Sequence, residues 1–188
     1  MHISIRAEAG QSVCAGAIGG RQLLSRLLAL TAREPTAPEP VLLDFSGVDV
    51  ATASYLRESV ITFRNFVRGR RSNVYPVTAN LNSAIAEELS DMLNAQGDAM
   101  LACETDDDGK VQSVKMLGRL EAKQQRVLAL IHERREIDAG QLQREFGDNE
   151  GVKQTSWNNR LSSLANLGLV FEFSDGRNKR YRPIFAGA

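Results

Sequence analysis

One stretch near the C-terminus gathers hydrogen-bonding side chains at the spacing of a helix. From 153 to 167, apolar residues recur every three or four positions, at Trp157, Leu161, Leu164 and Leu167, which predicts a helix with one side in a core. The other side has amide, hydroxyl and guanidinium groups and almost no acid. Its members are Gln154, Thr155, Asn158, Asn159, Arg160 and Ser163. Such groups hydrogen-bond to base edges and phosphates, so these six residues are candidates for contact with a DNA groove.

The stretch that follows predicts a two-stranded hairpin with a basic return strand. Gly168 is expected to end the helix, because the chain there must turn through positive φ. Apolar and polar residues then alternate as far as Asp175-Gly176, a strong hairpin signal. The tip and return strand carry the cations Arg177, Lys179, Arg180 and Arg182, of which the first three are candidates for contact with phosphates or a minor groove.

Two shorter helices are expected ahead of this helix. The stretch 123–135 places Val127, Leu128, Leu130 and Ile131 among charged residues, which predicts an amphipathic helix. A short β-like link at Ile137 follows. Asp138 is then the expected N-cap of a helix over 139–147, whose buried side would be Leu142 and Phe146.

The order helix, short strand, helix, loop, longer helix, hairpin resembles the winged helix-turn-helix superfamily over roughly 118–186, most closely the MarR-like bacterial transcription regulators. The resemblance is carried by L-x-x-L-x-x-L-G-L-V at 161–170 and by the D-G-R-N-K-R-Y wing at 175–181. It implies binding to double-stranded DNA. Because one winged helix reads only a few base pairs, a homodimer on a palindromic site is expected. Winged helices also serve as protein-interaction modules, and that alternative stays open.

The distribution of charge favours DNA only modestly. From 117 to 188 there are 12 Lys and Arg against 9 Asp and Glu, a balance of about +3, and the chain as a whole has a formal net charge of zero. The placement of the cations is more informative than their number. Five of them lie on the expected reading helix and wing: Arg160, Arg177, Lys179, Arg180 and Arg182.

The first hundred residues alternate between strand-like and helix-like segments, which predicts a small α/β layer with a mixed sheet. Strands are expected at 2–7, 41–43 and 74–77, with helices at 22–32, 55–68 and 84–93 and a basic loop at 68–71. The Gly19-Gly20 pair is expected to mark the start of the first helix or a bend. The segments 100–103 and 111–114 flank an Asp-Gly tip, as in a hairpin.

The string V-L-L-D-F-S-G-V-x-x-A-T-A-S-Y-L at 41–56 resembles the STAS fold of anti-sigma-factor antagonists, and more closely the STAS-like domains of unknown function. The resemblance covers roughly residues 1–102. In the antagonists the first serine of the loop accepts a phosphate, but Ala53 stands at that position here. Hydroxyls remain at Thr52 and Ser54, which are the candidates for a regulatory or partner-binding role. A purely structural role for Ser54, as the N-cap of its helix, is the favoured alternative.

Several other kinds of site are not expected. His2 and His132 are the only histidines, and neither has an apparent nucleophile beside it, so no enzyme activity is predicted. The two cysteines, Cys14 and Cys103, lack the spacing of a zinc site, and the acidic run 106–108 lacks the further ligands of a calcium loop. No cofactor or metal is therefore predicted. With no apolar run of about 20 residues and no signal peptide, a cytoplasmic protein without a membrane span is expected.

The sequence thus predicts a STAS-like α/β domain over 1–117 and an α+β winged helix-turn-helix domain over 118–188. The favoured hypothesis is a DNA-binding transcriptional regulator, in which the first domain senses a partner or mediates dimerisation. The alternative is a non-enzymatic adaptor that binds a protein partner, such as a kinase or ATPase, through the Thr52–Ser54 edge in the manner of an anti-sigma antagonist.

Overall fold

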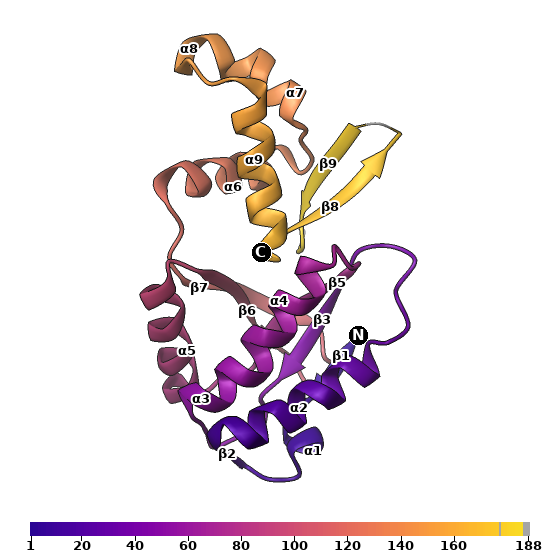
Figure 1. Ribbon diagram of the computed structural model, residues 1–188, viewed down its shortest axis with the longest axis vertical. Helices are drawn as coiled ribbons and strands as arrows, with labels where there is room; N and C mark the ends of the chain where they lie inside the picture. Colours follow the sequence, from indigo (N-terminus) through magenta and orange to yellow (C-terminus); the bar gives the residue numbers. More distant parts are fainter. Residues whose placement is uncertain (177, 186–188) are drawn as a thin grey trace.

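The computed structural model describes residues 1–176 and 178–185 (Figure 1). A mixed sheet of five strands, in the order β1-β3-β5-β6-β7, occupies the first part of the chain. The strands are β1 (His2–Ser4), β3 (Glu39–Asp44), β5 (Val74–Ala79), β6 (Ala99–Thr105) and β7 (Val111–Gly118). The first four run parallel, and β7 is antiparallel to β6. The expected α/β layer with a mixed sheet is confirmed, and so is the hairpin at its edge.

Helices cover one face of this sheet (Figure 1). They are α2 (Gly16–Leu30), α3 (Ala53–Leu56), the π-helical turn η1 (Arg57–Ile61), α4 (Thr62–Gly69) and α5 (Ser83–Gln96), with the short α1 (Ile5–Ala9) before them. A small parallel ladder joins β2 (Val13–Cys14) to β4 (Val50–Ala51). The segments α3, η1 and α4 follow one another without a break, as predicted for 55–68. The π turn coincides with a hydrogen bond of 2.8 Å from the Thr62 hydroxyl to the carbonyl oxygen of Arg57.

Three expectations about this part of the chain were wrong. The first strand ends at Ser4, because the Ser4 hydroxyl accepts the Ala7 N–H at 3.3 Å and starts α1. The helix expected at 22–32 begins at Gly16 instead, so that Gly20 lies inside it. Glycine is needed at position 20 because a Cβ there would lie 2.7 Å from the carbonyl oxygen of Tyr55. The basic loop expected at 68–71 begins later, because Arg68 and Gly69 still belong to α4, and Arg68 is only 4% exposed.

The rest of the chain forms a helical group and a hairpin. Its elements are α6 (Ala122–Arg134), α7 (Ala139–Leu142), the π-helical turn η2 (Gln143–Gly147), α8 (Asp148–Glu150), α9 (Gln154–Asn166), β8 (Val170–Asp175) and β9 (Asn178–Pro183). Asp138 caps α7 as predicted, and Ile137 forms a β-bridge with Tyr181. Gly168 follows the C-cap of α9 at a φ of +76°, also as predicted.

One hydrophobic cluster joins this second part to the sheet. Alternate residues of β3, β5 and β6 belong to it, including Leu42, Tyr75 and Leu101, and so do Leu169 and Ile184 beyond α9. Residues of the opposite parity, such as Val41 and Leu43, lie in the other cluster, beneath the helices. Since side chains alternate between the two faces of a sheet, the second part of the chain packs on the face that the helices leave open. Within the described residues, no helix has the length and apolar character needed to span a membrane.

Candidate nucleic-acid interface

The orientation of α9 agrees with its predicted amphipathic pattern. Trp157, Leu161 and Leu164 are each 0% exposed and face the core. The opposite side is open to solvent, and its exposed polar residues are Gln154, Thr155, Asn158 and Asn159. The 3–4 spacing of the apolar residues therefore predicted correctly that these amides would be exposed.

A polar groove of about 690 Å³ runs along this side of α9. Gln154, Asn158 and Ser162 form one wall, because residues four apart lie on the same stripe of a helix. Strand β9 contributes Asn178 and Lys179, and the remainder of the lining comes from the start of α7 and from Arg144. Every lining residue lies between 138 and 179. The predicted helix face and part of the hairpin thus share one surface that the sheet does not cover.

Four of the six residues of the predicted polar face do not line the groove. The Ser163 hydroxyl accepts a hydrogen bond of 2.8 Å from Nε2 of Gln124, so Ser163 faces α6. The Arg160 guanidinium lies over the Trp157 ring, with its central carbon 4.8 Å from the ring centroid. Thr155 and Asn159 are exposed on α9 outside the groove lining. Polarity alone did not distinguish these positions from the groove.

Six residues that line the groove were not among the predicted site residues: Asp138, Ala139, Gly140, Arg144, Ser162 and Asn178. Ser162 falls four and eight residues after Asn158 and Gln154, a spacing that identifies it as a neighbour of both. Its hydroxyl lies 3.2 Å from that of Tyr181. Arg144 belongs to the π turn η2, and no sequence signal placed it beside α9. It is exposed, and no ion pair to it is found within the described part of the chain.

The cations of the hairpin are engaged with acids. The Lys179 Nζ lies 2.7 Å from Oε1 of Glu172 on the facing strand. Arg180 and Arg182 both form ion pairs with Glu136, just beyond the end of α6. The predicted Arg177 lies outside the described residues. Over the described residues, the basic return strand of the predicted hairpin is therefore a set of partly exposed ion pairs. Such pairs are individually weak and are screened by salt.

Glu136 and Tyr181 respond to these surroundings. Hydrogen bonds from Arg180 and Arg182 hold the pKa of the Glu136 carboxyl below its ordinary value, because they favour the charged form. Burial raises the pKa of Tyr181 to about 12. The neutral Tyr181 hydroxyl donates to Oε2 of Glu172 at 3.0 Å. Glu172 thereby holds both Lys179 and Tyr181 at the edge of the groove.

The loop with the two candidate regulatory hydroxyls lies at the start of α3. Thr52, not Ser54, is the N-cap: its Oγ1 accepts the N–H of Tyr55 at 3.4 Å and that of Gly16 at 3.2 Å. Ser54 is the second residue of the helix, and its Oγ lies 3.2 Å from that of Thr52. The expectation that Ser54 caps the helix was wrong by two residues, because Thr52 is the last residue with extended backbone before the helix.

Comparisons with known proteins add no relative. Neither protein-family models, nor curated proteins, nor solved structures give a significant match to this chain. Within the described residues, no group of three or more His, Cys, Asp and Glu side chains is placed to hold a metal ion.

Proposed function

We propose that this protein is a DNA-binding transcriptional regulator, with a STAS-like domain followed by a winged helix-turn-helix domain. The observation that carries the proposal is the open polar groove that Gln154 and Asn158 share with Lys179. The order of the elements supports it, because an isolated antiparallel bridge between Ile137 and Tyr181 ties the link between α6 and α7 to strand β9 of the β8–β9 hairpin. A helix with exposed amides beside a basic hairpin suits a major groove and its flanking backbone.

The residues divide into two proposed roles. Gln154 and Asn158 carry amides that donate and accept at once, which is the chemistry that distinguishes adenine in the major groove. Arg144 and Lys179 supply charge for the phosphates. Lys179 would exchange Glu172 for a phosphate on binding, at low cost because the pair is partly exposed. Arg177 completes the proposed wing contacts on sequence grounds alone.

Selection from a pool of randomised duplexes tests this function. The wild-type chain is expected to enrich a palindromic motif, since two copies on a two-fold axis double the contacted sequence. Asn158→Ala should lose about 1–3 kcal/mol of the discrimination between bases at one position of each half-site. Asn94→Ala, an exposed amide on α5, is the matched control and should leave the motif unchanged. A pool that enriches no sequence above background contradicts sequence-specific reading.

A second candidate function rests on a separate observation. Val13 and Val50, partners in the β2–β4 ladder, are 52% and 46% exposed, and Ile18 nearby on α2 is 70% exposed. The Thr52 loop is close to these apolar side chains, because the N–H of Gly16, at the start of α2, donates to the Thr52 hydroxyl. We propose this edge as the protein-binding surface of the alternative adaptor function. Ile18→Ser would abolish partner capture there and leave DNA binding intact.

A further inference from the structure

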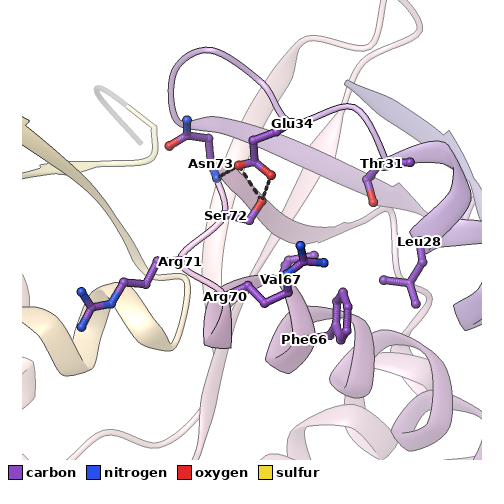
Figure 2. A pocket seen from close by; sticks show the side chains of 10 residues that line it. Leu28, Thr31, Glu34, Phe66, Val67, Arg70, Arg71, Ser72 and Asn73 are labelled. Carbon is purple, nitrogen blue, oxygen red and sulfur yellow. Dashed lines mark hydrogen bonds between the residues drawn. The ribbon is translucent and has the colours of Figure 1, made fainter.

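A second hollow lies away from the groove, between the last turns of α2 and α4 (Figure 2). Its volume is about 630 Å³, within the range of about 300–1,000 Å³ that is usual for small-ligand sites. Leu28 lines it from α2, and Phe66 and Val67 line it from α4. Phe66 is 43% exposed, although its neighbour Val67 is buried in the core. The hollow therefore offers an aromatic and aliphatic wall to a ligand from solvent.

Opposite charges stand on two sides of the same hollow. The Glu34 carboxylate accepts hydrogen bonds from the Ser72 hydroxyl, 2.9 Å from each oxygen, and from the Asn73 N–H. The Arg70 guanidinium carbon lies 5.2 Å from the Phe66 ring centroid. Figure 2 shows Arg70 among the other lining side chains, whereas Arg71 points away from them. Within the described residues, neither Glu34 nor Arg70 takes part in an ion pair.

We propose that this hollow binds a free α-amino acid with an apolar side chain. Glu34 would accept the ammonium group, Arg70 would donate to the carboxylate, and the side chain would lie against Leu28 and Phe66. A simple anion would face the Glu34 carboxylate, and a simple cation would face the Arg70 guanidinium. A zwitterion satisfies both charges, and an apolar side chain covers the exposed ring.

The same site is linked by contacts to the proposed DNA-reading helix. Ser72 donates its hydroxyl to Glu34, and its carbonyl oxygen accepts a hydrogen bond from Arg68. Arg68 in turn donates from Nε to the carbonyl oxygen of Ala165, at the end of α9, at 3.0 Å. A ligand that repositions Glu34 acts on this chain of contacts. This consequence, regulation of DNA affinity by the amino acid, rests on the proposed function, whereas binding of the amino acid does not.

Isothermal titration of the full chain, without DNA, tests the site. L-phenylalanine and L-leucine are expected to bind saturably. N-acetyl-L-phenylalanine lacks the ammonium and L-phenylalaninamide lacks the carboxylate, so each should bind about tenfold more weakly or worse. Glu34→Gln and Arg70→Gln should each weaken the binding of L-phenylalanine by a similar factor. Arg57→Gln removes an exposed cation on η1, outside the lining of the hollow, so this variant should bind as the wild type does.

Two results overturn the proposal. One is the absence of saturable heat for any apolar amino acid at millimolar concentration, with circular dichroism showing a folded chain. The other is binding that neither Glu34→Gln nor Arg70→Gln weakens. Because the titration contains no DNA, a chain that binds the amino acid but no duplex keeps this site and loses the regulator function. A chain that binds duplexes but no amino acid keeps the regulator function and loses this site.

Discussion

Arg68 and Ala165 join helix α4 to helix α9: Nε of Arg68 donates to the carbonyl oxygen of Ala165 across 97 residues of sequence, at 3.0 Å. The same guanidinium donates to Ser72 and to the Tyr75 hydroxyl, the latter at 3.1 Å, and lies 3.7 Å from the Tyr75 ring centroid. Tyr75 accepts the N–H of Glu172 on β8 at 2.9 Å. Burial lowers the pKa of Arg68, and the several acceptors around it compensate for the lost solvent.

Replacing this arginine should destabilise the whole chain. Arg68→Met keeps most of the side-chain volume but leaves the carbonyl oxygens of Ala165 and Ser72 without their donor, at a cost of about 2–4 kcal/mol in the free energy of unfolding. Arg70→Met, two residues later and exposed, should change it by less than about 0.5 kcal/mol. Urea denaturation of both variants measures the difference. Equal midpoints would mean that Arg68 does not hold the two parts together.

Two glycines of neighbouring helices should respond to alanine in opposite directions. A Cβ at Gly20 would lie 2.7 Å from the Tyr55 carbonyl oxygen and 2.9 Å from Cβ of Glu58, so α2 must move away from the α3–η1 helix. Gly20→Ala is expected to cost about 1–3 kcal/mol. At Gly69 nothing lies within 4 Å of the added Cβ, and alanine there should stabilise by up to about 1 kcal/mol. Thermal unfolding of the two variants shows whether each substitution raises or lowers stability. A Gly20→Ala variant that is more stable than the wild type would refute this packing.

The ion pairs at Glu136 predict a specific dependence of stability on pH. The folded pKa of Glu136 is depressed below its ordinary 4.5, so the stability that its charge contributes is fully present above that value. It is lost as the pH falls through the lower, folded pKa. The stability difference between wild type and Glu136→Gln should therefore be constant near neutral pH and shrink below about pH 4.5. Melting temperatures across this range measure it, and a difference that stays constant in acid would show that the pairs do not form.

The same glutamate should limit DNA binding. Glu136→Gln removes the acid that Arg182 shares with Arg180, which leaves the charge of Arg182 for phosphates, so affinity for any duplex should rise several-fold at low salt. Glu104→Gln is the control, because Glu104 is also paired, with Lys115 on the distant edge of the sheet at 3.9 Å. Fluorescence anisotropy with a labelled duplex compares them. An equal rise in both variants would indicate a general charge effect rather than a local one.

Patterns among neighbouring residues predicted the local structure. They did not predict which residues distant in sequence would contact one another. The spacing of Trp157, Leu161 and Leu164 oriented α9, and Asp175-Gly176 located the hairpin turn, because these signals depend on a few neighbouring residues. Glu136 and Arg180 are 44 residues apart, and their pairing depends on how α6 packs beside the hairpin. The run R-G-R-R at 68–71 suggests a surface position for Arg68, because the run does not contain the acceptors that satisfy its guanidinium. These acceptors are the carbonyl oxygen of Ala165 and the hydroxyl of Tyr75.

The central claim, that the groove along α9 binds DNA, is tested most directly by the salt dependence of binding. Anisotropy titrations over a range of salt should give the wild type a steep slope of log Kd against log salt concentration. Arg144→Ala with Lys179→Ala removes two groove cations and should flatten that slope by about 1.8, at about 0.9 for each phosphate contact. Lys115→Ala, on the edge strand β7 and outside the groove lining, should leave it unchanged. A wild-type chain that binds no duplex, or a groove variant with the wild-type slope and affinity, would contradict the claim.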